Sequence, residues 1–503
     1  MTARFALFVA FLVSCPASAR AEWPDWGNGP ARNMVSEGKN APVDIDPGKK
    51  IKGKDEVDMA TTKGLKWAVR LGSQSYGTPT VANGRVLVGT NNENPFDTKY
   101  TGDRSITLCL DEKTGQMIWQ LPSPKLGTGK VSDWEFLGMC SPATIEGNRA
   151  YIATNRNHVV CLDMEGMKNG NDGPFKDEAN YFSSPENKID AVGDNDADII
   201  WIFDMRAECG VFPHNQTSCA VLVLPDRLYI TTCNGVDWTH TNIPAPNAPS
   251  LICLDKKTGA LLGEDAADIS KNCLHCSWAS PAWAKFGGKE KIIFGGGDGF
   301  LHAFDMGFKE DDGLQIINHL WKYDANASEY RVDKDGKKKK YMEYDGPSEV
   351  ISTPVIYKDN IYTLTGQDPE HGEGLGMLSC VSADGKPIWT NKEISRSVST
   401  PSIHDDILYV TDYSGILHCL NALTGEKHYT YDTKGHIWGS TLVVDGKVYV
   451  GNEEGELHIL AAGKTLKELG TVDFPGPIYA SPVFANDTLY VMTMSQLYAF
   501  GPK

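Results

Sequence analysis

Outside its first 21 residues, the sequence has no apolar run long enough to cross a membrane, which takes about 20 consecutive residues. It also has little positive charge: 48 Lys and Arg residues stand against 65 Asp and Glu residues, and the formal net charge is −17 at pH 7. A chain this acidic is a poor partner for nucleic acid or for an anionic membrane surface. The two absences argue against a membrane-spanning protein and against a nucleic-acid-binding one.

A motif for covalent haem attachment is also missing. Cys273 and Cys276 have the spacing of such a motif, but Ser277 stands where a histidine is required. Other interpretations of this pair stay open: a redox-active or metal-binding pair, a local disulfide, or two unpaired thiols.

All cysteines except Cys15, near the N-terminus, fall into two groups. Five occupy the same position of an internal repeat: Cys109, Cys161, Cys253, Cys380 and Cys419. Because a residue type that recurs at one repeat position indicates a packing role, we expect these five to be small buried thiols. Six lie near strand starts and loops: Cys140, Cys209, Cys219, Cys233, Cys273 and Cys276. In an exported protein we expect some of these six to form disulfides, whose connectivity cannot be read from sequence.

Residues 399–431 show the internal repeat most clearly. Three short runs rich in Ile, Leu, Val and Tyr are separated by the turn residues Asp405-Asp406, Ser414-Gly415 and Thr424-Gly425. Apolar runs with turn residues about every 8 to 12 positions are typical of antiparallel strands. With one more short run they make a four-stranded sheet, the blade of a propeller.

The unit recurs along the chain. An apolar run opens with a two-residue step eight times. In six copies the step is Ser-Pro or Thr-Pro, and in two copies another residue replaces the proline. The second residue of the step falls at positions 79, 142, 219, 281, 354, 401, 441 and 482. The last three positions are 40 and 41 residues apart, which fits the roughly 40 to 45 residues of a propeller blade. The sequence therefore predicts an all-β fold, an eight-bladed β-propeller of four-stranded antiparallel blades.

The two ends of the predicted propeller, residues 64–503, complement each other. The copy that begins at Ser481-Pro482 has room for three strands, and the run Leu65–Arg70 precedes the first copy. Pairing this N-terminal strand with the last blade would close the ring and leave no long open edge. Residues 22–63 lack periodicity and are expected to form an extended lead-in strapped to the ring.

Residues 1–21 have the features of an export signal. Arg4 supplies the charge, residues 5–13 the apolar core and residues 19–21 an A-x-A cleavage site. We therefore expect a periplasmic or secreted protein. Cys15 leaves a lipoprotein anchor open as the lesser alternative.

Long connections gather on one predicted face. In a propeller, the loop between the second and third strands of a blade lies on the same face as the segment that leads into the first strand. The long loops are residues 91–105, 234–250 and 366–376, and the leading segments are residues 134–140, 208–218, 272–280 and 435–439. Functional groups are commonly carried on such loops of a rigid scaffold. The sequence therefore predicts one functional site at one mouth of the central channel.

The residue types at this mouth suggest three roles. Carboxylate and carbonyl oxygens suit a hard cation such as calcium, and the candidate metal ligands are Asn234, Asp237, Asp368 and Glu370. Imidazoles and carboxylates serve as bases, and the candidate catalytic residues are Asp237, His240 and His371. Indole rings stack on planar cofactors, and the candidate cofactor-binding residues are Trp278, Trp438, His214, Asn215 and Gln367. The alternative stays open that these Asn and Asp residues build long turns and the histidines bind loop carbonyls.

The repeat ends in the motif D-x-x-T-G-x-x-x-W, complete at residues 111–119 and partial at residues 255–263, 384–389 and 421–429. It resembles the tryptophan-docking motif of the pyrroloquinoline quinone (PQQ)-like propellers, over roughly residues 64–502. This family includes periplasmic quinoprotein alcohol dehydrogenases, with PQQ and calcium over the channel, and an outer-membrane assembly lipoprotein that binds no cofactor. The strings around His214, Asp237 and Gln367 also resemble exported bacterial propellers described as PQQ-binding-like.

The resemblance implies the fold, an eight-bladed ring, more firmly than the chemistry. Quinoprotein alcohol dehydrogenases carry a disulfide between adjacent cysteines that face the quinone, whereas this chain has no adjacent pair of cysteines. The glutamate, asparagine and aspartate with which those enzymes bind their cofactor also find no matching motif here.

Three functions stay open. The sequence does not determine the oligomeric state. The leading hypothesis is an exported quinoprotein oxidoreductase, with PQQ and calcium at the mouth, that oxidises a small-molecule substrate such as an alcohol or sugar and passes electrons to an accepting protein. The alternatives are a non-catalytic envelope scaffold that binds proteins, and a propeller with a metal or carbohydrate site unrelated to quinone.

Overall fold

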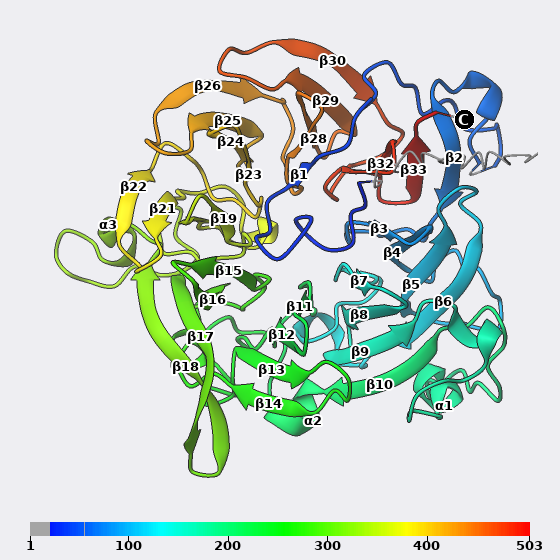
Figure 1. Ribbon diagram of the computed structural model, residues 1–503, viewed down its shortest axis with the longest axis horizontal. Helices are drawn as coiled ribbons and strands as arrows, with labels where there is room; N and C mark the ends of the chain where they lie inside the picture. The colour runs from blue at the N-terminus through cyan, green and yellow to red at the C-terminus, as the bar shows by residue number, and fades with distance from the viewer. Residues whose placement is uncertain (1–20, 55, 503) are drawn as a thin grey trace, which may run out of the picture.

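The computed structural model describes residues 21–54 and 56–502, which form a ring of β-sheets (Figure 1). Of the export signal expected at residues 1–21, all but Ala21 lies outside the described residues. The described strands form seven sheets, and the eight-stranded one consists of two four-stranded meanders joined by one parallel pairing of Glu264 with Ile316. With these two counted separately, the described strands contain eight four-stranded units. The predicted all-β propeller architecture is confirmed.

The first four units follow one another along the chain, each with its innermost strand first. Unit 1 contains β3 (Thr80–Ala82), β4 (Arg85–Asn91), β5 (Arg104–Asp111) and β6 (Met117–Pro124). Unit 2 contains β7 (Thr144–Glu146), β8 (Arg149–Ala153), β9 (His158–Asp163) and β10 (Asp198–Asp204). Unit 3 contains β11 (Leu222–Val223), β12 (Arg227–Thr231), β13 (Leu251–Asp255) and β14 (Leu261–Glu264). Unit 4 contains β15 (Ala282–Phe286), β16 (Lys289–Gly295), β17 (Phe300–Asp311) and β18 (Leu314–Asp324).

The remaining units continue around the ring. Unit 5 contains β19 (Val355–Tyr357), β20 (Asn360–Leu364), β21 (Leu378–Ser382) and β22 (Pro387–Asn391). Unit 6 contains β23 (Ser402–His404), β24 (Ile407–Thr411), β25 (Ile416–Asn421) and β26 (Lys427–Asp432). Unit 7 contains β27 (Leu442–Val444), β28 (Lys447–Gly451), β29 (Glu456–Ala461) and β30 (Glu468–Asp473). Unit 8 contains β31 (Val483–Ala485), β32 (Thr488–Met492), β33 (Gln496–Phe500) and, from the N-terminal side, β2 (Leu65–Arg70).

Helices are short and lie in the connections. The α-helices are α1 (Glu178–Phe182), α2 (Met205–Cys209) and α3 (Ser328–Arg331). The 3-10 turns are η1 (Met59–Thr61), η2 (Gly129–Val131), η3 (Gly166–Asn169), η4 (Ser270–Asn272) and η5 (Pro369–His371). Among the described residues, no helix has the length and apolar character needed to cross a membrane.

The ring closes as predicted. Strand β2 pairs antiparallel with β33, with Trp67 opposite Ala499 and Arg70 opposite Gln496. The N-terminal strand therefore supplies the outer strand of unit 8, and the first and last parts of the propeller lie side by side (Figure 1).

The tryptophans of the outer strands join neighbouring units. Trp389 on β22 donates from Nε1 to the carbonyl of Ala422 at 2.9 Å, and its ring covers Gly425 in the turn of unit 6. A Cβ added at Gly425 would lie 2.7 Å from that ring, so the turn has no room for a side chain. The same packing joins Trp67 to Gly115, Trp201 to Gly259 and Trp321 to Gly385. This contact explains why Gly and Trp recur together in the D-x-x-T-G-x-x-x-W motif.

A glycine substitution tests this contact. Gly425→Ala is expected to lower the free energy of unfolding by about 3 kcal/mol, of which about 1 kcal/mol is strain at φ +75° and the rest is overpacking against Trp389. Gly446 has φ +69° and nothing within 4 Å of an added Cβ, so Gly446→Ala should cost only about 1 kcal/mol. Chemical denaturation measures both values. Equal losses would contradict the docking role of the tryptophan.

The strap, residues 23–36, crosses the ring and bonds to every unit in turn (Figure 1). The strap contains β1 (Val35–Ser36), which pairs with β27. Backbone or side-chain hydrogen bonds connect the strap to one residue on or beside each innermost strand: Val81, Ile145, Val221, Trp283, Ile356, Ile403, Val443 and Phe484. A segment of 14 residues thus ties all eight units together from inside the ring.

Candidate functional site

An inner cavity of about 500 Å³ occupies the middle of the ring. It is lined by the residues that lead into the innermost strands, such as Thr78, Ser280 and Thr400, and by Trp26 of the strap. The strap bonds to Val81, Trp283 and Ile403, three residues further along these same strands. The strap therefore lies across the channel beneath the inner cavity, where Trp26 forms part of the lining.

Two of the three long loops predicted to share one mouth, residues 234–250 and 366–376, meet there. His240, in the connection between β12 and β13, has its ring centroid 5.6 Å from that of His371, in the connection between β20 and β21. Asn215, in the segment leading into β11, donates from Nδ2 to Asp368 Oδ2 at 3.1 Å. Units 3 and 5 thus contribute to a single site, which also takes residues 272–280 of unit 4.

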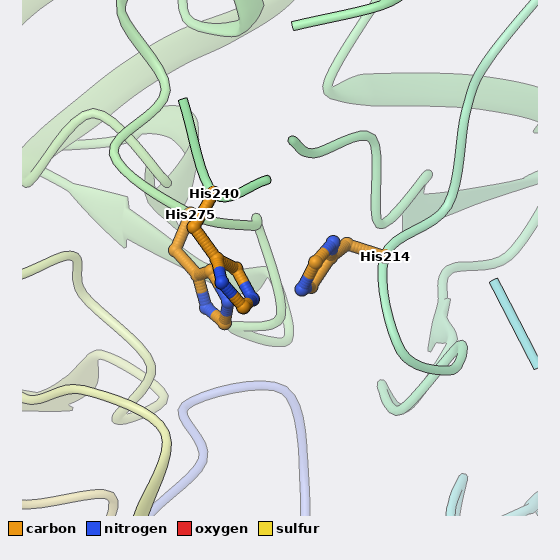
Figure 2. A group of neighbouring side chains, drawn as sticks. All are labelled: His214, His240 and His275. Atoms are coloured by element: carbon orange, nitrogen blue, oxygen red, sulfur yellow. The ribbon is translucent and has the colours of Figure 1, made fainter. Parts of the chain in front are cut away.

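Three imidazoles converge at this mouth: His214, His240 and His275 each offer one ring nitrogen, and these nitrogens lie within 4.8 Å of one another (Figure 2). His214 approaches from one side, and His240 and His275 approach from the other. His214 and His275 are 1% and 0% exposed, whereas His240 is exposed. His371 completes the histidine cluster, with its ring centroid 4.9 Å from that of His275.

The connection between β12 and β13 fixes the orientation and tautomer of the His214 ring. The Nδ1 of the ring donates to the carbonyl of Val236 at 2.6 Å, which leaves Nε2 as the nitrogen with a free lone pair. That Nε2 is buried and has no hydrogen-bond partner. Burial, and then the neighbouring His275, lower the pKa of His214 to about 3, so the ring is neutral at pH 7.

His275 is even more isolated. Both of its ring nitrogens are buried without a hydrogen-bond partner, and its ring stacks on Tyr341 with centroids 5.2 Å apart. Burial lowers the pKa of His275 to about 3. Unpaired buried nitrogens are costly, so a ligand that supplies the missing partner would be stabilising.

A buried carboxyl group stands behind this histidine. Glu349 Oε1 lies 3.7 Å from His275 Nδ1 and accepts a hydrogen bond from the Tyr341 hydroxyl at 2.9 Å. Burial raises the pKa of Glu349 to about 8, so the carboxyl group is largely protonated at pH 7. A cation bound by His275 would favour its ionised form.

An outer cavity of about 380 Å³ adjoins the inner one. Three of the histidines line it, namely His214, His240 and His371. Asn215, Trp134, Asp368 and Glu370 line both cavities. The boundary between the two spaces is therefore acidic and polar.

Most of the predicted site residues lie at these cavities. His214, His240 and His371 belong to the histidine cluster. The other five line the inner cavity: Asn215, Trp278, Asp368, Glu370 and Trp438. Trp278 also packs its ring against His275, with centroids 5.2 Å apart.

Three predicted residues use their side chains for hydrogen bonds to residues of the connecting segments. Asn234 accepts from the amide of Phe212 and donates to the carbonyl of Ala245, and Gln367 Nε2 donates to the carbonyls of Tyr341 and Pro347. The Asp237 carboxylate accepts from Thr239 and Asn242, which are part of the same turn. For Asn234 and Asp237 the turn-building interpretation describes the contacts, whereas Gln367 ties its loop to the connection between α3 and β19.

The sequence did not single out His275, Tyr341 or Glu349. His275 lies within the string Cys273-Leu274-His275-Cys276, which had been considered for its cysteines. A signal was available, because residues 272–280 were already placed at the mouth. Tyr341 and Glu349 lie in the long connection between α3 and β19 and showed no pattern.

The cysteines hold no disulfide in the described part of the chain. Cys109, Cys161, Cys253, Cys380 and Cys419 are buried, as predicted. Cys219, Cys233 and Cys276 lie together under the mouth, with Sγ of Cys219 and Cys233 3.9 Å apart. The expectation that some cysteines form disulfides is not met in this structure.

Known proteins resemble the chain in both sequence and fold. Residues 56–163 and 374–502 match a family model described as outer membrane protein assembly factor BamB. BamB of Legionella pneumophila (strain Paris) is 30% identical over 146 residues, which are 29% of this chain and 35% of that protein. BamB of Shewanella oneidensis is 31% identical over 80 residues, 15% of this chain and 20% of that protein. The chain thus matches only about a third or less of these curated relatives.

Solved structures share the fold at low sequence identity. BamB from Moraxella catarrhalis superimposes with a TM-score of 0.53 and 13% identity, over 87% of this chain and 97% of that one. The quinohemoprotein alcohol dehydrogenase ADHIIG from Pseudomonas putida HK5 gives 0.59 and 11% identity, over 96% and 80%. All four clustered histidines lie between the two segments that match the family model. The resemblance to the PQQ-like propeller family is confirmed, and the histidine cluster lies outside the part of the chain that matches it in sequence.

Proposed function

We propose that the protein is an exported propeller metalloenzyme that holds a transition metal on the histidines at the channel mouth and acts on a small molecule in the adjoining cavity. The convergence of His214, His240 and His275 supports this most directly. Two of the three are buried and neutral, and each has at least one ring nitrogen that lacks a hydrogen-bond partner. A purely structural histidine would be expected to use those nitrogens.

The ligand type selects the metal. Neutral imidazoles suit zinc, copper, iron and nickel, whereas calcium prefers oxygen ligands. When bound, such a metal supplies Lewis-acid or redox chemistry next to the cavity. His214 would coordinate through Nε2, because Val236 holds its Nδ1.

Groups around the cluster are placed to move protons. His371 has a buried Nδ1 without a partner, and burial lowers the pKa of its ring, so the ring is neutral at pH 7 and its free nitrogen is available as a base. Glu370 lines both cavities, and partial burial together with Asp368 raises its pKa. Glu370 therefore lies where the two cavities meet, and His371 lines the outer cavity beside the histidines that would bind the metal. From these positions either group could take a proton from a bound substrate.

PQQ, which the family resemblance implies, suits the inner cavity poorly. PQQ is planar, which suits Trp278 and Trp438, but it carries three carboxylates. No Lys or Arg is among the described residues that line the inner cavity, and Asp368 and Glu370 would repel an anion. The lining of the inner cavity therefore offers no cation that would pair with the carboxylates of PQQ. Dye-linked alcohol oxidation that depends on added PQQ and calcium would restore the quinoprotein hypothesis.

Metal binding is the test of the proposal. Purified protein, stripped with chelator, is titrated with Zn²⁺ and Cu²⁺ by calorimetry and with Co²⁺ by visible spectroscopy, and one equivalent is expected to bind. His275→Ala should weaken binding about a hundredfold or more, since it removes a buried ligand. His404→Ala, at a surface histidine of β23, is the matched control and should bind as the wild type does. Failure of the wild type to bind any of the three ions would contradict the proposal.

A second candidate function rests on the sequence match. The repeats at residues 56–163 and 374–502 resemble BamB, so a role in outer-membrane protein assembly is a candidate for that part of the ring. Deleting the gene should then lower the amounts of outer-membrane proteins. Complementation with His275→Ala separates the two functions, because a scaffold would not need this side chain.

A further inference from the structure

Three aromatic side chains from three neighbouring units face the inner cavity opposite the histidine cluster. This aromatic trio consists of Tyr76, Trp438 and Tyr479. Tyr76 stacks on Tyr479 with ring centroids 5.4 Å apart and an interplanar angle of 21°, and Trp438 lies 4.6 Å from Tyr479 and 5.9 Å from Tyr76. The trio comes from the segments that lead into β3, β27 and β31, so the rigid ring fixes it in place.

Trp438 is anchored by its edge. Its Nε1 donates to Glu453 Oε2 at 3.0 Å, and Tyr413 contacts the ring edge-on at a centroid distance of 6.3 Å. The indole donor is thus satisfied outside the cavity. A ligand in the cavity would therefore meet the carbon surface of this ring, not its N–H group.

Carboxylates surround the trio. Glu370 and Asp368 line the same cavity, and after burial their charges are among the causes that raise the pKa of the Tyr76 hydroxyl. Glu453 and Glu454 act in the same way on Tyr479. Among the described residues that line the inner cavity none is Lys or Arg; Lys130, which lines the outer cavity, is the cation that acts on Glu370.

Aromatic faces and carboxylates attract the same class of ligand. The face of an aromatic ring carries partial negative charge and binds a cation within about 6 Å, most strongly in the case of tryptophan. The geometry points to an organic cation as the ligand of the inner cavity: an alkylammonium or quaternary ammonium group held by the aromatic trio, with its charge offset by Asp368 and Glu370. The volume of the inner cavity, about 500 Å³, limits the ligand to a small molecule.

This inference does not depend on the metal proposed above. The trio belongs to units 1, 7 and 8, whereas the histidines that would bind the metal belong to units 3 and 4. In the proposed enzyme, the ligand would be an amine substrate whose substituents extend toward the histidine cluster. The proposal of a cation site and the proposal of a metal site can therefore be contradicted independently of each other.

A pair of nearly isosteric probes tests the inference. Choline and 3,3-dimethylbutan-1-ol differ mainly in that a carbon replaces the charged nitrogen, and each is titrated into untreated protein by calorimetry and tryptophan fluorescence. Choline is expected to bind at least tenfold more tightly. Trp438→Leu and Asp368→Asn should each weaken choline binding about fivefold or more, and circular dichroism checks that the variants are folded. Trp238→Leu, at a 72% exposed tryptophan of the outer cavity, should change nothing.

Each outcome decides the question. Equal binding of the two probes, or no choline binding by the wild type, would overturn the inference without any variant. A loss in Trp238→Leu as large as that in Trp438→Leu would also overturn it, because the cation would then bind in the outer cavity. Metal binding is measured on the same preparation: choline binding without metal binding would support this inference and remove the proposed metalloenzyme, and the reverse result would do the opposite.

Discussion

Replacing Arg32 with alanine should lower the free energy of unfolding by about 4 kcal/mol. Arg32 is fully buried in the strap, and its guanidinium donates to the carbonyls of Trp26, Val221 and Pro281. It also pairs with Asp25 at 3.4 Å, and burial raises the pKa of that carboxyl group. The alanine variant would leave the carbonyls of Trp26 and Pro281 without this partner, and the Val221 carbonyl and the Asp25 carboxyl group with Thr144 and Gly29 alone. This is far more costly than the loss of a surface ion pair.

Two control variants make the prediction specific. Arg32→Lys keeps the positive charge but loses the forked geometry that reaches units 3 and 4 together, so we expect a loss of about 2 kcal/mol. Lys52→Ala, at an exposed lysine of the same N-terminal segment, should stay within about 0.5 kcal/mol of the wild type. Urea denaturation followed by tryptophan fluorescence gives the three values. A loss for Arg32→Ala no larger than that for Lys52→Ala would mean that the strap does not stabilise the ring.

The sequence predicted the ring because the ring is built from local patterns. The turn residues Asp405-Asp406 and Thr424-Gly425 mark the connections of unit 6, and Leu65–Arg70 matches the closing strand β2. Each of these signals lies within one repeat, so neighbouring residues determine it. The tryptophan–glycine contact repeats with the unit, which is why it also left a motif.

The path of the strap left no such signal. Arg32 bonds to a carbonyl 249 residues away, and Asn33 to one 370 residues away. A backbone carbonyl is present at every residue, so these contacts place no demand on the sequence of the partner strand. The lack of periodicity in residues 22–63 indicated an extended segment but could not show where it runs.

The candidate site was predicted in part, for a similar reason. His214, His240 and His371 were found because propeller geometry brings their loops to one face. Asp237 was taken for a ligand by its residue type, but a short polar side chain in a turn bonds first to its own backbone, and Asp237 accepts from Thr239 and Asn242. His275 was missed because its neighbours are cysteines. Its two buried ring nitrogens, which lack hydrogen-bond partners, make it a better candidate ligand than Asp237.

Lowering the pH from 7 to 5 should destabilise the metal-free protein through His214 and His275. Both are neutral in the folded state, with pKa values lowered to about 3, whereas an unfolded histidine has a pKa of about 6.5. Between these values the unfolded chain binds more protons, so their contribution is complete above pH 6.5 and is lost as the pH falls. The loss by pH 5 is about 2 kcal/mol for each histidine, or about 4 kcal/mol for the two.

Glu349 acts in the opposite direction. Its pKa is raised to about 8 in the folded state, so in this pH range the folded chain holds a proton that the unfolded chain has released. Its contribution therefore grows as the pH falls and masks part of the histidine effect. The contribution of Glu349 to the free energy of unfolding cancels when the wild type is compared with a histidine variant, because neither His214 nor His275 is among the main causes of the raised pKa of Glu349.

The measurement is therefore a difference between two proteins. The double variant His214→Gln/His275→Gln cannot take up these two protons, so its free energy of unfolding should fall by about 4 kcal/mol less than that of the wild type between pH 7 and pH 5. Urea denaturation at both pH values, in the presence of chelator, gives the four numbers. His404→Gln removes a surface histidine and should follow the wild type. If the double variant also followed the wild type, the two histidines would not be held neutral at the mouth, and the main support for a metal centre there would be lost.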